Sequence, residues 1–267
     1  MNTAYFNFLE SCWQDYIAST PSARKINELL SAEGEQVIND HIAFRTWSDS
    51  AFSIDHFKKI FLEWGLVEGG EYFFPNKKVR AIHLQDPTDP SVPKVFISEI
   101  LWKEFSPEFA RITAKTIEQL PTDGDLLSMM QKKICWEQNS EEYETLSRES
   151  EYGSWLYAWG IRPNHFTVSI NSLKKFNDIL TLNAFLKEKG FSLNSSGGEV
   201  KGSAQLFLEQ SSIMADKMTV YFSGTAKSIP SCYYEFAKRY QQENGILYQG
   251  FNEKSADKIF ESTNAKS

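Results

Sequence analysis

The stretch QVINDHIAFRTW at residues 36–47 decides the fold class of this chain. Its alternation of polar and apolar residues predicts a β-strand. Successive side chains of a strand point to opposite faces, so His41 and Arg45 share one face while Ile42 and Phe44 share the other. The apolar face must pack on a core, and the polar face then lines a second enclosed space.

The segments that follow complete a unit of one strand, one helix and three strands. SIDHFKKIFLEWG at 53–65 carries apolar residues at helical spacing and ends at a glycine. Three strand-like segments come next: EYFFP at 71–75, VRAIHLQ at 79–85 and KVFISEIL at 94–101. This order is the first βαβββ module that we expect, over residues 35–102.

The same order returns later in the chain and predicts a second module over residues 159–243. NHFTVSIN at 164–171 reads as a strand, and a helix is expected over 172–191. Further strands are expected at AQLFLEQSS, MTVYFSG and CYYEFAKRY, which span 204–212, 218–224 and 232–240. The two copies share almost no sequence identity, so only the pattern repeats. Sheets built in this way are mixed or antiparallel, which makes the fold class α+β.

Three further segments surround the two modules. Residues 1–34 predict two helices, the first with Phe6, Leu9, Trp13 and Ile17 on one face and the second beginning at Pro21. Residues 103–158 are charged and helical in pattern, GDLLSMMQKKICW at 124–136 included, and predict a helical connector. Residues 244–267 predict a tail that is helical from about Ser255.

Composition and charge exclude several classes of function. The formal net charge of -7 disfavours binding to a phosphate backbone, so nucleic acid is not an expected partner. The sequence contains neither a long apolar run nor a secretory signal, so no membrane association is expected. Cys12, Cys135 and Cys232 lie far apart, which argues against a disulfide framework and a zinc–thiolate site and favours a reducing compartment, the cytoplasm.

Two histidines and two carboxylates occupy similar places in the two copies. His41 and His165 lie on the polar faces of the opening strands, and Glu99 and Glu235 follow in the last strands. A carboxylate among apolar neighbours is costly to bury unless it is paired or bound to a metal. Two imidazoles and one carboxylate form the facial triad of non-haem iron(II) enzymes. The pattern alone also allows His41 and His165 to be hydrogen-bonded histidines of the core, and Glu235 to be one partner of an ion pair.

Three segments resemble the 2-oxoadipate dioxygenase/decarboxylase family: NDHIAFRT, NHFTVSIN, and YYEFAKR followed by GFNEKSADKIFEST. The fold of this family is similar to that of the vicinal oxygen chelate enzymes, which pair two βαβββ modules around one metal. The resemblance implies an Fe(II) cofactor with His41, His165 and Glu235 as ligands. It also implies that Arg45, four residues after the first ligand, binds the substrate.

The activity implied by the resemblance is the conversion of 2-oxoadipate, or a similar 2-oxo dicarboxylic acid, with O2 to 2-hydroxyglutarate and CO2 in lysine breakdown. Other functions stay open: an extradiol dioxygenase, a glyoxalase-like isomerase with nickel or zinc, or a non-catalytic binding protein of the same fold. The presence of both histidines and the glutamate argues against a pure binder. The oligomeric state is open too.

Other roles for the candidate residues also stay open. Arg45 either clamps a substrate carboxylate or forms a structural ion pair. Glu99 is a second candidate carboxylate ligand, at the point of the first copy that matches Glu235 by spacing. His83 shares a face with Ala81 and lines the expected pocket without contacting the metal.

Overall fold

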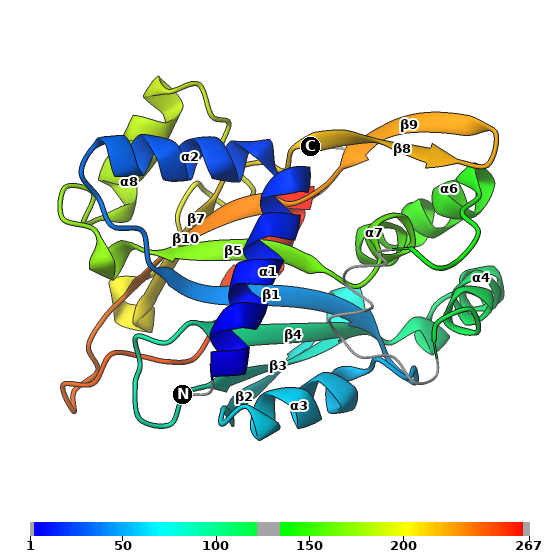
Figure 1. Ribbon diagram of the computed structural model, residues 1–267, viewed down its shortest axis with the longest axis horizontal. Helices are drawn as coiled ribbons and strands as arrows, with labels where there is room; N and C mark the ends of the chain where they lie inside the picture. The colour runs from blue at the N-terminus through cyan, green and yellow to red at the C-terminus, as the bar shows by residue number, and fades with distance from the viewer. Residues whose placement is uncertain (1–2, 122–133, 264–267) are drawn as a thin grey trace.

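One curled eight-stranded sheet forms the centre of the computed structural model, which describes residues 3–121 and 134–263 (Figure 1). The strand order is β2-β3-β4-β1-β5-β10-β7-β6. The strands are β1 (Asn39–Trp47), β2 (Val67–Phe74), β3 (Val79–Gln85), β4 (Lys94–Ile100), β5 (Pro163–Ser169), β6 (Lys201–Ser203), β7 (Leu208–Ser212) and β10 (Tyr233–Arg239).

The two halves of this sheet repeat one arrangement. In the first half β1 pairs with β4 in parallel, and in the second half β5 pairs with β10 in parallel. The halves join where β1 and β5 pair antiparallel at the middle of the sheet. Together with one helix after each opening strand, this confirms the α+β fold of two βαβββ modules. The boundaries 35–102 and 159–243 stay predictions.

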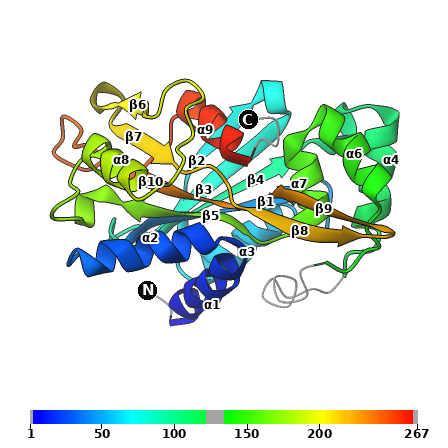
Figure 2. The ribbon, with the colours of Figure 1, turned by 90° about the horizontal axis from the view of Figure 1, so that it is seen from above.

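Helices cover the outer face of the sheet, and they are α1 (Thr3–Ser19), α2 (Pro21–Ala32), α3 (Ile54–Glu63) and α8 (Ile179–Glu188). Figure 2 shows α1, α2 and α3 together on that side. The ring of Phe8 from α1 packs on Phe44 of β1, with ring centroids 5.9 Å apart. The prediction of two N-terminal helices is confirmed. Of the residues expected on one face of α1, Leu9, Trp13 and Ile17 contact the core, but Phe6 is 47% exposed, and Tyr5 and Phe8 are buried in its place.

The predicted helical connector is confirmed in the described residues and lies at one end of the sheet (Figure 1). Its helices are α4 (Pro107–Ile117), α6 (Ser140–Glu149) and α7 (Glu151–Trp159). Most of the segment GDLLSMMQKKICW lies outside the described residues.

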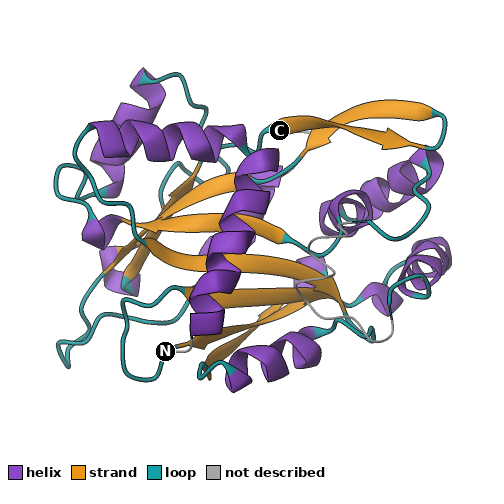
Figure 3. Ribbon diagram, viewed as in Figure 1, coloured by secondary structure: helices purple, strands orange, loops and turns teal. Residues whose placement is uncertain are grey.

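A hairpin packs beside the connector and corrects one strand assignment. The segment 218–224 was expected in the second module, but β8 (Lys217–Phe222) pairs only with β9 (Thr225–Pro230) in a separate two-stranded sheet (Figure 3). The short strand β6 takes its place in the module. The physical reason is exposure: alternate residues of β8 face solvent, whereas β4 of the first module is buried throughout.

The tail closes the inner face of the sheet. The helix α9 (Glu253–Ile259) and the 3-10 turn η5 (Phe260–Thr263) lie on the side opposite α1 and α2 (Figure 2), as expected for a tail that becomes helical near Ser255. Contacts of α9 with β2, β6 and β7 join the two halves of the sheet. The inner face is therefore enclosed between the sheet and the tail. None of the helices in the described ranges has the length and apolar character that a membrane crossing needs.

Candidate metal centre

Three predicted residues meet on the inner face, each from a different strand. His41 lies on β1, His165 on β5 and Glu235 on β10, and all three side chains are buried. Ligand atoms of the three lie within 4.8 Å of one another. The two Nε2 atoms are 3.3 Å apart, and Glu235 Oε2 lies 3.2 Å from His165 Nε2. Residues separated by up to 194 positions in the chain thus converge on one point.

The donor set fits a bound divalent metal. Ligands that bind at about 2.1 Å and at right angles have donor atoms about 3.0 Å apart, close to the observed spacing. Burial lowers the pKa of both His41 and His165, so the imidazoles are neutral as metal binding requires. Burial raises the pKa of Glu235 to about 8, and its Oε2 has no hydrogen-bond partner. A cation would compensate this buried carboxylate.

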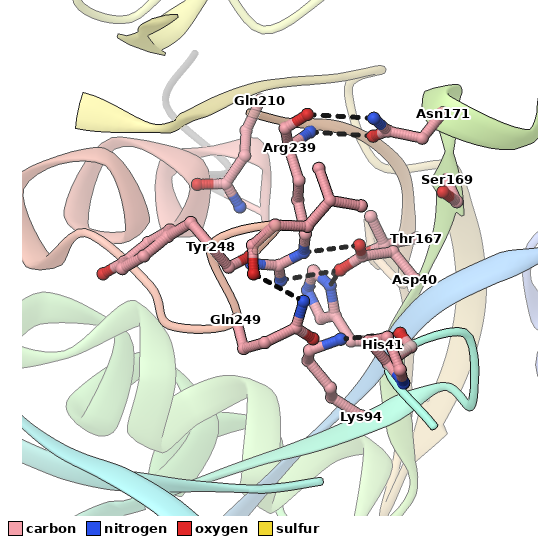
Figure 4. Close-up of polar contacts among 12 residues, drawn as sticks. Asp40, His41, Lys94, Thr167, Ser169, Asn171, Gln210, Arg239, Tyr248 and Gln249 are labelled. Carbon is pink, nitrogen blue, oxygen red and sulfur yellow. Dashed lines mark hydrogen bonds and ion pairs between the residues drawn. The ribbon is translucent and has the colours of Figure 1, made fainter. Parts of the chain in front are cut away.

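Each histidine has a polar residue immediately before it that reaches its ring. Asp40 Oδ1 accepts a hydrogen bond from His41 Nδ1 at 2.8 Å (Figure 4), and the amide of Asn164 lies 3.3 Å from His165 Nδ1. Strand neighbours normally point to opposite faces, but the β1–β5 register shifts at both positions. The extra residue of such a bulge turns its side chain toward that of its neighbour. The bond to Asp40 leaves the lone pair of His41 Nε2 directed at the site.

Asp40 is itself held by Arg239 from the end of β10, as Figure 4 shows. The guanidinium donates to both carboxylate oxygens, at 2.7 and 2.8 Å. Burial alone would raise the pKa of Asp40, but the charge of Arg239 and the bond from His41 hold that pKa well below its usual range. Arg239 also donates to the carbonyls of Tyr248 and Gly250. One buried arginine therefore joins the metal centre to the tail.

Two further residues contact the triad directly. Gln210 on β7 donates its Nε2 hydrogen to Glu235 Oε1 at 2.5 Å, which orients that carboxylate. The Thr167 hydroxyl lies 3.1 Å from His41 Nε2, on the shared inner face of β5. Each ligand thus has at least one polar neighbour that fixes its orientation.

The tail forms the opposite wall of the centre. Phe251 packs edge-on against His41, with ring centroids 4.8 Å apart, and its backbone N–H donates to the Tyr72 hydroxyl. Phe260 lines the same space, whose volume is about 20 Å³. That volume holds one water molecule or one ion, and no larger ligand.

Arg45 lies on the same strand face as His41 and is fully buried. It donates to Glu151 Oε1 at 2.8 Å and to Thr263 Oγ1 at 3.0 Å. Burial would lower its pKa, but the neighbouring Glu151 charge raises that pKa overall. The structure thus contains the ion pair that the sequence left open for Arg45.

Comparison with known proteins decides the family. The family model of 2-oxoadipate dioxygenase/decarboxylase matches residues 6–132 and 122–245, which is most of the chain. The chain belongs to the 2-oxoadipate dioxygenase/decarboxylase family. Within this family of enzymes, a chloroplastic 2-oxoadipate dioxygenase/decarboxylase of Arabidopsis thaliana is 38% identical over 275 residues, 93% of this chain and 74% of the plant protein.

Two solved structures are similar over nearly the whole chain. The hydroxyglutarate synthase of Oryza sativa in complex with 2-oxoadipate has a TM-score of 0.90 and 32% identity, covering 98% of this chain and 93% of that chain. A Shewanella frigidimarina protein, provisionally described as a hydrolase, has a TM-score of 0.87 and 47% identity, covering 94% and 98%. The family assignment thus agrees with the fold and with the triad.

Glu99 is not part of the centre, and its expected equivalence to Glu235 is wrong. In the first half of the sheet, Phe96 of β4 lies opposite Ala43, two residues after His41. In the second half, Glu235 of β10 lies opposite Thr167, two residues after His165. Phe96 is therefore the residue of the first half that corresponds to Glu235. Glu99 is three residues further along and therefore faces the outer side. There it accepts from the Ile54 backbone N–H at 2.8 Å and from Arg80.

His83 lies near the centre but contacts other residues. Tyr72 donates its hydroxyl hydrogen to His83 Nδ1 at 2.8 Å, and Nε2 lies 3.2 Å from Gln85 Oε1. Its ring packs against Phe251, with centroids 5.3 Å apart. Burial lowers the pKa of His83 to about 4, so the ring is neutral. His83 therefore supports the tail wall from behind Phe251, and it is neither one of the three grouped ligands nor one of the residues that line the space beside them.

Sequence reasoning missed the residues that support the ligands. Asp40, Asn164, Gln210 and Arg239 were not among the candidates. One signal was present: an Asn or Asp precedes each histidine, in NDH and PNH. Without the bulges, strand alternation assigns these side chains to the opposite face.

Proposed function

We propose that this chain is an Fe(II)-dependent dioxygenase that converts 2-oxoadipate, or a similar 2-oxo dicarboxylic acid, and O2 to 2-hydroxyglutarate and CO2. The observation that carries this proposal is the buried triad of His41, His165 and Glu235 in a member of this family. The 2-oxoadipate in the rice structure supports the substrate class. The reaction balances: one oxygen atom enters the new carboxylate and the other enters the hydroxyl group.

We assign this reaction to lysine breakdown in the cytoplasm. Support for the compartment comes from the wide spacing of Cys12, Cys135 and Cys232 in the sequence, a pattern typical of proteins in a reducing compartment. The pathway follows from the proposed substrate alone. Tracing labelled lysine into 2-hydroxyglutarate in cells with and without the protein tests the pathway, and fractionation of the cells tests the compartment.

The residues of the chain have separate tasks in this proposal. His41, His165 and Glu235 would hold the iron, which when bound would supply the activation of O2, while the 2-oxo acid itself would supply the electrons that reduce O2. Asp40 and Gln210 fix the orientation of two ligands. The aromatic wall around Phe251 excludes water from the reacting groups.

Oxygen dependence is the direct test of the proposed reaction. Iron-loaded protein with 2-oxoadipate should consume O2 and release CO2 in equal amounts, and should form none of the product under nitrogen. With labelled O2, both the new carboxylate and the new hydroxyl should carry label. An isomerase or a hydrolase would work equally well without O2, and a binding protein would give no turnover. Either result would overturn the proposal.

Arg45→Lys is expected to weaken substrate binding while the metal stays bound. Lysine keeps the positive charge but lacks the planar fork that pairs with a carboxylate through two hydrogen bonds. We expect KM to rise about 10- to 100-fold, because a charge-assisted hydrogen bond contributes about 1.5–3 kcal/mol. Steady-state kinetics and iron analysis measure the two effects. Unchanged KM values in both Arg45→Lys and Arg45→Ala would exclude this role.

A further inference from the structure

The guanidinium of Arg45 is enclosed on most sides by aromatic rings. Tyr152, Trp155 and Phe260 lie with their ring centroids 4.8, 5.0 and 5.7 Å from the Arg45 Cζ atom. Phe260 also lines the metal centre, so Arg45 lies directly behind one wall of that centre. The side of the guanidinium away from these rings is occupied by Glu151 and by the Thr263 hydroxyl.

A second, larger cavity begins at these two partners of Arg45. Its volume is about 440 Å³, and both Glu151 and Thr263 lie on its wall. The remaining wall comes from α6, α7 and the β9 strand of the hairpin, and includes Trp159 and Lys227. Small-molecule sites have volumes of about 300–1,000 Å³. The cavity is thus large enough for a diacid, whereas the space beside the triad is not.

The ion pair between Arg45 and Glu151 is asymmetric. The Arg45 side chain is 0% exposed and cannot turn to solvent, whereas the Glu151 side chain is 28% exposed at the cavity wall. Glu151 is the first residue of α7, where the helix dipole favours a negative charge even without Arg45. An unpaired buried guanidinium is costly, so Arg45 needs a carboxylate at all times. Glu151 can leave only if another carboxylate replaces it.

We propose that Glu151 is an exchangeable carboxylate, which occupies Arg45 until a carboxylate of the 2-oxo diacid arrives through the 440 Å³ cavity and displaces it. This inference rests on the proposed function, in which Arg45 binds the substrate. The exchange keeps the buried charge of Arg45 compensated throughout. It also selects for a carboxylate, because a neutral ligand cannot replace Glu151 without leaving Arg45 unpaired.

Glutarate binding to the metal-free protein tests the exchange. Glutarate is a dicarboxylate without the keto group, so its binding requires no turnover. Removing the competing carboxylate in Glu151→Ala should tighten glutarate binding at least about tenfold by calorimetry, and glutarate should raise the melting temperature of the variant more than that of wild type. Glu151→Gln, which keeps the size of the side chain, should show the same direction of change.

Two control variants make the result specific to Arg45. Glu144 lies on the same cavity wall but pairs with Lys227, so Glu144→Ala should not tighten glutarate binding. In the double variant Glu151→Ala/Arg45→Met the gain should disappear. If Glu151→Ala and Glu151→Gln bind glutarate no more tightly than wild type does, then Glu151 is a fixed partner of Arg45. Failure of the proposed function is recognised separately, as absence of oxygen-dependent turnover in wild type.

Discussion

His165→Ala is expected to lose the bound iron and the activity together. His165 supplies one of three buried ligand atoms, and its Nε2 lies 3.2 Å from Glu235 Oε2. Loss of a residue that only supports a ligand already costs about 10- to 100-fold in metal affinity, so loss of a ligand should cost more than about 100-fold. Iron analysis after gel filtration and oxygen uptake with 2-oxoadipate measure the two losses. His41→Ala should behave in the same way.

Two controls separate this loss from misfolding. His56 is on α3, on the outer face of the sheet, so His56→Ala should keep its iron. Glu235→Gln removes a carboxylate whose Oε2 has no hydrogen-bond partner, so the metal-free variant should be no less stable to urea than metal-free wild type, yet should not bind iron. Full iron content and full turnover in His165→Ala would show that the ion is bound elsewhere.

The order of helices and strands could be predicted because each element carries apolar residues at its own period. The strand around Ile42 and Phe44 buries its apolar face as expected. The buried face of α1 could not be chosen in the same way, because Tyr5, Phe8 and Phe6 are all large and the helix is apolar on most sides. Contact with β1 and β5 decides that face, and it is not visible in the helix sequence.

The three grouped residues of the candidate site could be predicted, but the place of the second candidate carboxylate, Glu99, and the supporting residues could not. The number of residues between each histidine and the later carboxylate suggested that Glu99 corresponds to Glu235. The parallel pairing of β1 and β4 instead places Phe96 opposite Ala43, at the position that Glu235 has in the second module. An offset of three residues along a strand reverses the face. The bulges before His41 and His165 have a similar effect, because each adds one residue to the count. Face assignments from alternation fail wherever the pairing is irregular.

Asp40→Ala is expected to weaken metal binding and to destabilise the fold through two separate contacts. His41 loses the acceptor of its Nδ1 hydrogen, and metal affinity should fall about 10- to 100-fold. Arg239 loses both of its bonds to a carboxylate and stays buried, which should cost roughly 3–5 kcal/mol of the free energy of unfolding. Metal titration of the folded variant measures the first effect, and urea unfolding of the metal-free protein measures the second.

Comparison with another buried carboxylate shows which effect belongs to the metal centre. Glu35 accepts hydrogen bonds from the backbone N–H groups of Lys174 and Lys175, in a turn outside the triad. Glu35→Ala should therefore destabilise the fold and leave metal affinity unchanged. Asp40→Asn keeps an oxygen that can accept from His41 Nδ1, so its metal affinity should fall less than that of Asp40→Ala. Equal metal affinities in Asp40→Ala and Glu35→Ala would mean that the fold, and not Asp40, orients the imidazole of His41.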